Sequence, residues 1–291
     1  MKIKTTHLSG QVGKSGSGYE AEIMQGSTHP KTFIGLKGGL GDARSDSLYD
    51  VGRSIIEETD GEFAVGLIAT TRPKNIVAVL RGDPQKARQR RSQSVYGAMR
   101  HSVEHLSPDE VLLGGQSQGG ISVVDAVAYG IKNKKDVFPD NTQVFTIDTP
   151  SMFGAEEHKE HPLFILPKLG IHCAKDAPRI PLSTYVKIVK GNTFSRSMFE
   201  PVYFAREAMY LLDNLDASEE AITVRTKYLL HHLFHKDDIV PGAEQEEHPF
   251  VTVFDGGHVE AMTREGIPPV RDYIIGLSLR NCPIEDSNRA A

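Results

Sequence analysis

Short apolar runs alternate with amphipathic stretches along most of the chain. Runs rich in β-branched and aromatic residues predict buried strands at 31–36, 62–68, 75–80, 110–113, 143–147, 228–234 and 250–254, with two more strands around a turn near residue 14. Apolar residues at helical spacing predict helices at 45–58, 84–106, 121–131 and 269–279. Strands that alternate with helices in this way favour an α/β fold, with a mostly parallel sheet covered by helices on both faces.

One long stretch, residues 151–226, interrupts this alternation. It separates two predicted strands by roughly 75 residues, which is longer than a plain crossover connection requires. The stretch is rich in proline and aromatic residues, among them Phe153, Phe164 and Phe199. We expect an inserted lid at 151–226 on a core made of 1–150 and 227–291, and an apolar lid favours a substrate with an apolar group.

The sharpest local motif is Gly115-Gln116-Ser117-Gln118-Gly119, which lies between a predicted strand and a predicted helix. A nucleophilic serine on a tight strand-to-helix turn needs glycines on either side, because side chains there would clash. The helix that follows directs its N–H groups and positive dipole end toward charge that develops at the site. The motif therefore predicts Ser117 as a nucleophile; a glycine- and serine-rich connecting loop is the alternative interpretation.

A serine nucleophile needs a base, and His258 is the best candidate. It follows the last predicted strand directly, on a turn that contains Gly256 and Gly257, so it lies at the end of the sheet where the serine is expected. The other histidines have different interpretations: structural residues in or beside a strand (His231, His232, His235), a helical pair without a third metal ligand (His101, His105), and lid residues at the surface or along a substrate path (His158, His161, His172).

The base in turn needs an acid that orients it, and three aspartates qualify. Asp237 is the first choice and Asp238 the second, because both follow a predicted strand and precede His258. Asp148 is the third, since it ends the strand 143–147 and an acid on that neighbouring strand reaches the same imidazole. A helix cap or a turn is the structural alternative for each of them.

These motifs together resemble the α/β-hydrolase superfamily, and in particular its lipases and esterases. The resemblance is carried by the order Ser117, Asp237, His258, by Asp-Asp-Ile-Val-Pro at 237–241, and by Thr149-Pro150 after a strand; it spans residues 31–280 apart from the lid. It implies an eight-stranded, mostly parallel sheet and a Ser-His-acid triad.

The resemblance also implies an oxyanion hole. One N–H would come from Gln118, the residue after the nucleophile, and the second from the loop after the third strand. By position the N–H of Gly39 is the best second donor and that of Leu40 the next. Many relatives have His-Gly at the start of this loop, where this chain has Lys37-Gly38.

Composition and charge narrow the classes of partner. The 291 residues carry a formal net charge of −5, which argues against nucleic acid. Two cysteines favour neither a disulfide framework nor a cysteine-rich zinc site, and we expect no metal and no cofactor. The first residues lack the apolar core of a secretory signal, and no apolar run is long enough for a transmembrane helix, so a cytoplasmic protein is expected.

One basic group has two interpretations. It comprises Lys86, Arg88, Arg90, Arg91 and Arg100 on the helix predicted at 84–106. A solvated helix face is the first, and a surface that receives an anionic part of a substrate or partner is the second.

The function that these features predict is hydrolysis of a carboxylic ester or thioester through an acyl-enzyme. An acyltransferase on the same triad is the first alternative. A ligand-binding protein that keeps the fold without turnover is the second, although simple binding does not require a serine, a histidine and an acid together. No sequence feature indicates an oligomeric state.

Overall fold

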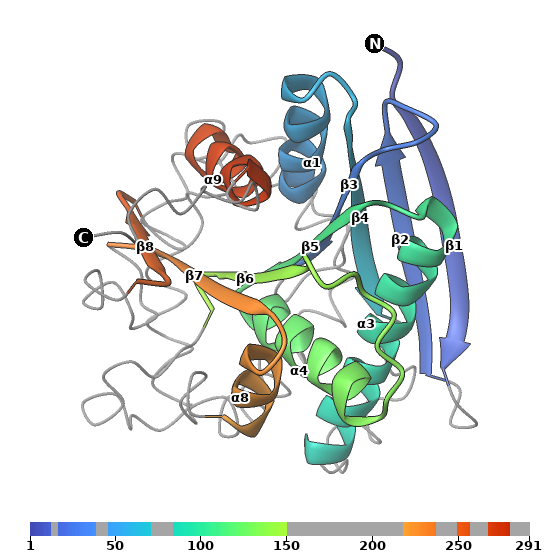
Figure 1. The fold of residues 1–291 in the computed structure, drawn as a ribbon, viewed down its shortest axis with the longest axis vertical. Coiled ribbons are helices and arrows are strands. Elements are labelled where there is room, and N and C mark those ends of the chain that lie inside the picture. The colour runs from blue at the N-terminus through green and yellow to red at the C-terminus, as the bar shows by residue number, and fades with distance from the viewer. Residues whose placement is uncertain are drawn as a thin grey trace, which may run out of the picture.

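A twisted sheet forms the centre of the molecule (Figure 1). The computed structural model describes residues 1–12, 17–38, 46–70, 84–149, 218–236, 249–256 and 267–279. Within these ranges the sheet has eight strands in the order β1-β2-β4-β3-β5-β6-β7-β8. Their bounds are β1 Lys4–Val12, β2 Ser17–Gln25, β3 Thr32–Lys37, β4 Phe63–Thr70, β5 Glu110–Gln116, β6 Gln143–Ile147, β7 Leu229–His235 and β8 Val251–Phe254. The pairs β1–β2 and β2–β4 are antiparallel and the pairs from β4 to β8 are parallel, so the predicted, mostly parallel sheet is confirmed.

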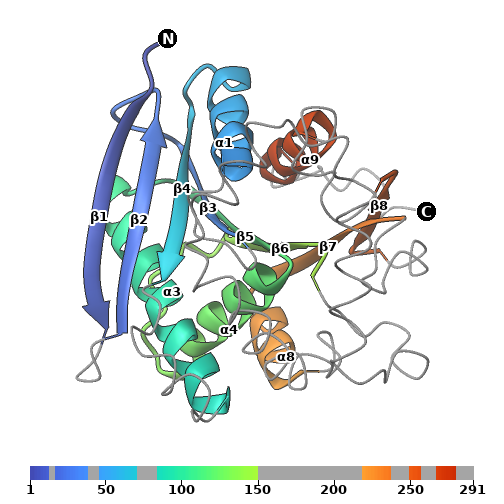
Figure 2. The same cartoon turned by 180° about the vertical axis from the view of Figure 1, so that it is seen from behind.

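Helices cover both faces of this sheet, as the two opposite views show (Figures 1 and 2). One face carries α3 (Pro84–Leu106), α4 (Gln118–Lys132) and α8 (Glu219–Arg225), and the other carries α1 (Asp46–Glu58) and α9 (Ile267–Leu279). The sheet therefore separates two apolar clusters, one beneath each helical layer. The apolar face predicted for the first helix is confirmed, because its members are all buried: Leu48, Val51, Ile55 and Ile56.

The central strands are buried along their whole length. Every residue of β3, β5 and β6 is buried, which explains their continuous apolar runs, since a strand covered on both faces has no solvent side. Two phenylalanines lie against glycines of neighbouring strands: the ring of Phe33 against Gly66 and the ring of Phe145 against Gly114. A Cβ at either glycine would come within 3.0 Å of the ring, so the missing side chains make room for the aromatic core.

Element bounds agree closely with the sequence analysis, with three differences. The helix predicted at 121–131 begins earlier, at Gln118. The strand predicted at 110–113 continues to Gln116, because the glycines that follow pair with β3 and β6. Residues 218–226, the last part of the predicted lid, instead contain α8, whose Ala221 and Val224 belong to the core cluster beneath α3 and α4. The strand predicted at 75–80 and the rest of the predicted lid lie outside the described residues. Within the described ranges, no helix has both the length and the apolar character needed to cross a membrane.

Candidate active site

Ser117 occupies the turn between β5 and α4 in a conformation that non-glycine residues rarely adopt. Its φ is 53° and its ψ is −131°. A backbone of this kind costs on the order of 1–3 kcal/mol and persists only where the surroundings determine it. The side chain makes no capping hydrogen bond to the first turn of α4, which is the usual structural task of a serine at this position.

Three backbone contacts hold Ser117 in this conformation. Its N–H donates to the carbonyl of Ile147 at 2.8 Å. Its carbonyl accepts from the hydroxyl of Thr149 at 3.0 Å and from the N–H of Gly120 at 3.0 Å. The end of β6 therefore binds both backbone polar groups of Ser117.

The two glycines of the motif are required by contacts between backbones. A Cβ at Gly115 would come within 3.0 Å of the backbone of Gly119 and Gly120. A Cβ at Gly119 would come within 3.0 Å of the carbonyls of Lys37 and Gly38 at the end of β3. Backbone atoms cannot move aside as a flexible side chain does, so the spacing of Gly115 and Gly119 follows from a tight elbow and not from loop composition.

Part of the predicted oxyanion hole lies within the described residues. Gln118 begins α4, so its N–H belongs to the first turn, whose N–H groups have no partner within the helix. At the end of β3, the buried Lys37 donates from Nζ to the carbonyl of Gly38 at 2.9 Å. The expected second donor, Gly39, lies outside the described residues.

Asp148 lies directly after β6 and is fully buried. Its Oδ1 accepts from the backbone N–H of His235 at 2.9 Å, and its Oδ2 lies 2.7 Å from Nδ1 of the same histidine. The third-choice acid thus contacts the last residue of β7. The other members of the predicted triad, Asp237 (or Asp238) and His258, lie outside the described residues.

The structure therefore brings together part of the predicted site. Ser117, the two glycines, the N-terminus of α4 and Asp148 meet at the carboxyl ends of β5 and β6. Sequence reasoning missed the pairing of Asp148 with His235, although both residues end predicted strands that neighbour each other in the sheet.

Two further histidines of β7 bind side chains of β6. His231 Nε2 lies 2.9 Å from Gln143 Oε1, and His232 Nδ1 lies 2.8 Å from Thr146 Oγ1. Both histidines are buried, so their interpretation as structural residues is confirmed. On α3, His101 Nδ1 lies 3.1 Å from the hydroxyl of Tyr19. Among the described residues, no three His, Cys, Asp or Glu side chains are arranged to hold a metal ion.

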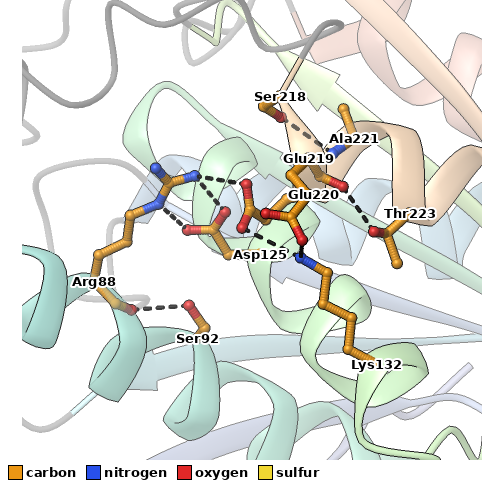
Figure 3. Close-up of polar contacts among 9 residues, drawn as sticks. All are labelled: Arg88, Ser92, Asp125, Lys132, Ser218, Glu219, Glu220, Ala221 and Thr223. Atoms are coloured by element: carbon orange, nitrogen blue, oxygen red, sulfur yellow. Dashed lines mark hydrogen bonds and ion pairs between the residues drawn. The ribbon is translucent and has the colours of Figure 1, made fainter.

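Arg88, one member of the basic group on α3, is bound to carboxylates of the neighbouring helices. Arg88 binds Asp125 of α4 through two hydrogen bonds, of 2.6 and 2.7 Å, and lies 3.8 Å from Glu220 of α8 (Figure 3). Lys132 of α4 contacts Glu219 at 2.7 Å, so charges join all three helices (Figure 3). The interpretation as a solvated face is wrong for Arg88, whereas Arg100 is half-exposed and pairs with Glu104 on its own helix.

Burial raises the pKa of the Asp125 carboxyl, and the Arg88 guanidinium acts in the opposite direction. Removing a carboxylate from water disfavours its charged form, while a bidentate guanidinium favours it. The Arg88 guanidinium therefore stabilises the charged form of the buried Asp125 carboxylate.

Comparison with known proteins identifies the fold. No protein-family model matches the sequence, and no curated protein matches it. Solved structures do match. Carboxyl esterase 2 from the fungus Tuber melanosporum has a TM-score of 0.58 at 14% identity, over 96% of this chain and 87% of that chain. The epoxide hydrolase CorEH has a TM-score of 0.55 at 13% identity, over 95% of this chain and 99% of that chain. The mouse alpha/beta hydrolase domain-containing protein 10 has a TM-score of 0.52 at 14% identity, over 95% of this chain and 99% of that chain. The chain therefore has the α/β-hydrolase fold.

Proposed function

We propose that the protein is a serine hydrolase that cleaves a carboxylic ester or thioester with an apolar group. The strained backbone of Ser117 is the observation that carries this proposal. Three hydrogen bonds to the Ser117 backbone and two obligatory glycines maintain the strain, yet the Ser117 side chain does not cap the helix that it precedes. An arrangement of this kind presents a hydroxyl at the end of a sheet, which is what nucleophilic attack requires.

In the proposed mechanism, Ser117 Oγ attacks the acyl carbonyl carbon while His258 takes its proton. Asp237 orients the imidazole and stabilises its charged form. The N–H groups of Gln118 and Gly39 bind the tetrahedral oxyanion, and loss of one such donor costs on the order of 10²–10³ in rate. His258 then gives the proton to the leaving oxygen or sulfur. Water attacks the acyl-enzyme in the same way and releases the carboxylic acid and Ser117.

An acyltransferase would form the same acyl-enzyme in the first half-reaction. In the second half-reaction, an alcohol or amine would accept the acyl group in place of water. A ligand-binding protein would not require the strained serine, because a glycine at position 117 would form the same turn without strain. The fold is shared by esterases and an epoxide hydrolase among the matched structures, so the fold alone does not choose the reaction.

Labelling with a fluorophosphonate probe tests the nucleophile. We expect the wild type to be labelled and Ser117→Ala to be neither labelled nor active on p-nitrophenyl esters. Ser102→Ala is the matched control, because its hydroxyl only returns a hydrogen bond to Ala98 within α3, and it should label like the wild type. A wild type that is folded but unlabelled would overturn the proposal.

A second comparison assigns the acid and the type of enzyme. Asp237→Asn and Asp238→Asn, measured side by side, should differ by orders of magnitude in kcat, since only one of them orients the imidazole. Product analysis in the presence of an added alcohol then separates a hydrolase from an acyltransferase: free acid as the main product supports hydrolysis.

A further inference from the structure

We propose that Asp148 and His235 form a positioning pair that holds the Ser117 turn and the end of β7 in their working arrangement. This inference rests on the proposed function of Ser117. Both side chains are almost completely buried, at 0% and 3% exposure, and the pair makes two hydrogen bonds of 2.9 and 2.7 Å. Such a pair at a strand end is costly to bury unless its geometry is good, which makes it sensitive to substitution.

The first argument is that Asp148 lies between the two residues that bind Ser117. Ile147 accepts the Ser117 N–H, and Thr149 donates to the Ser117 carbonyl. Asp148 itself has a φ of 45°, which is uncommon for a non-glycine residue, and its side-chain contacts constrain it there. Its carboxylate, bound to β7, supplies that constraint, and its N–H adds a bond of 2.8 Å to Leu233 of the same strand. The conformation of 147–149, and through it the Ser117 backbone, thus depends on the pair.

The second argument concerns the other end of the pair. His235 is the last residue of β7 and precedes the proposed acid, Asp237, by two positions. Asp148 binds both the backbone N–H and the ring of His235, and the next N–H, of Lys236, donates to Phe254 of β8 at 2.9 Å. The pair therefore sets where the chain leaves the sheet on its way to the acid.

The third argument is chemical. An ionised carboxylate only accepts hydrogen bonds, so the proton of a neutral His235 lies on Nδ1 and leaves Nε2 as an acceptor. An asparagine at position 148 keeps its amide oxygen on the His235 backbone N–H and turns its NH₂ toward the ring. The ring must then accept at Nδ1, and the proton moves to Nε2. Asp148→Asn therefore preserves shape while reversing the tautomer.

The chain offers a matched control for this test. Thr146 and His232 join the same two strands by a buried hydrogen bond of 2.8 Å, further from the strand ends. The hydrogen bonds of the Ser117 backbone go instead to Ile147, Thr149 and Gly120. Thr146→Val removes that bond with little change of shape. We expect it to lower the melting temperature and to leave kcat, KM and the labelling rate of Ser117 within about twofold of the wild type, since the turn is undisturbed.

The decisive variants are Asp148→Asn, His235→Leu and His235→Asn. We expect the first two to lower kcat and the rate of fluorophosphonate labelling by roughly 10–100-fold with KM nearly unchanged, because a small displacement of the nucleophile is sufficient for such a loss. His235→Asn should recover most of the rate, since its amide nitrogen replaces Nδ1 as the donor to Asp148. NMR of the His235 ring should show Nδ1–H in the wild type and Nε2–H in Asp148→Asn.

Three outcomes would overturn the inference. Full labelling of Asp148→Asn and His235→Leu, at melting temperatures lowered as far as in Thr146→Val, would make the pair purely structural. Loss of activity in Asp148→Asn with an unaffected His235→Leu would mean that Asp148 orients the catalytic imidazole directly. An unlabelled wild type would remove the proposed function and this inference together, which distinguishes that failure from the first two.

Discussion

At the scale of single residues, an unusual backbone conformation occurs at the ends of two neighbouring strands. Ser117 and Asp148 both have positive φ angles, and each directly follows a buried strand. They are joined through Ile147 and Thr149, so the two strained backbones support each other. Strain of this kind is retained where function requires a fixed geometry, and the surrounding hydrogen bonds compensate its cost.

The glycines around Ser117 give the clearest prediction at this scale. Gly119→Ala should lower the free energy of unfolding by at least about 2 kcal/mol, because its Cβ would meet backbone carbonyls that have no room to move. The labelling rate of Ser117 should fall as well. Urea denaturation and labelling measure the two effects.

Gly276→Ala provides the control for that substitution. Gly276 lies within α9 and nothing lies within 4 Å of the added Cβ. Alanine is the better helix former, so this change should stabilise the protein by about 0.5–1 kcal/mol. Equal stability changes for the two alanine variants would contradict the account of the elbow.

At the scale of elements, ion pairs of very different burial join the helices of one layer. Arg88 and Asp125 connect α3 to α4, and Asp125 is buried, whereas Arg100 and Glu104 lie half-exposed on α3. Arg88→Ala leaves a buried carboxylate without its bidentate partner, and we expect a loss of about 3–5 kcal/mol. Arg100→Ala should change the stability by less than about 1 kcal/mol.

The Arg88→Ala deficit should depend on pH. Burial already raises the pKa of Asp125 above its ordinary value of 3.8, and loss of Arg88 removes the main influence that lowers it. At pH values between the pKa of Asp125 in the unfolded chain and its higher pKa in the folded protein, the folded state binds more protons than the unfolded state. The free energy of unfolding therefore falls as pH rises through this range. The deficit relative to the wild type should therefore be larger at about pH 8 than at about pH 5. A deficit that shrinks with rising pH would contradict this assignment.

The elements show where sequence reasoning succeeds and where it cannot. The helix at 84–106 and the strand at 143–147 have the predicted bounds, since periodicity and caps are local signals. The elbow is also predictable from a local signal, because Gly115 and Gly119 lie within two residues of Ser117 in the sequence. The α8 helix was missed because its seven residues lie next to a long atypical stretch. The pairs Arg88–Asp125 and Asp148–His235 join distant parts of the chain, and only the folded topology reveals them.

At the scale of the whole molecule, burial decreases from the centre of the sheet toward its antiparallel edge. The strands β3, β5 and β6 are wholly buried, while β1 pairs only with β2 in the described sheet and alternates between exposed and half-buried residues. Local opening is easiest where few contacts must break. Hydrogen exchange followed by mass spectrometry should therefore show β1 exchanging well before β5, and comparable protection of the two strands would contradict this gradient.

The anchoring of Thr149 and α8 has a consequence for how the chain can be recombined. Thr149 is bound to Ser117 and Ile147, and α8 is capped by Ser218 and tied to α3 and α4 by its own glutamates. The core thus holds both residues that flank the stretch 150–217. Recombination or grafting between Thr149 and Ser218 would therefore exchange the stretch 150–217 while Ser117 and the hydrogen bonds to its backbone are inherited intact.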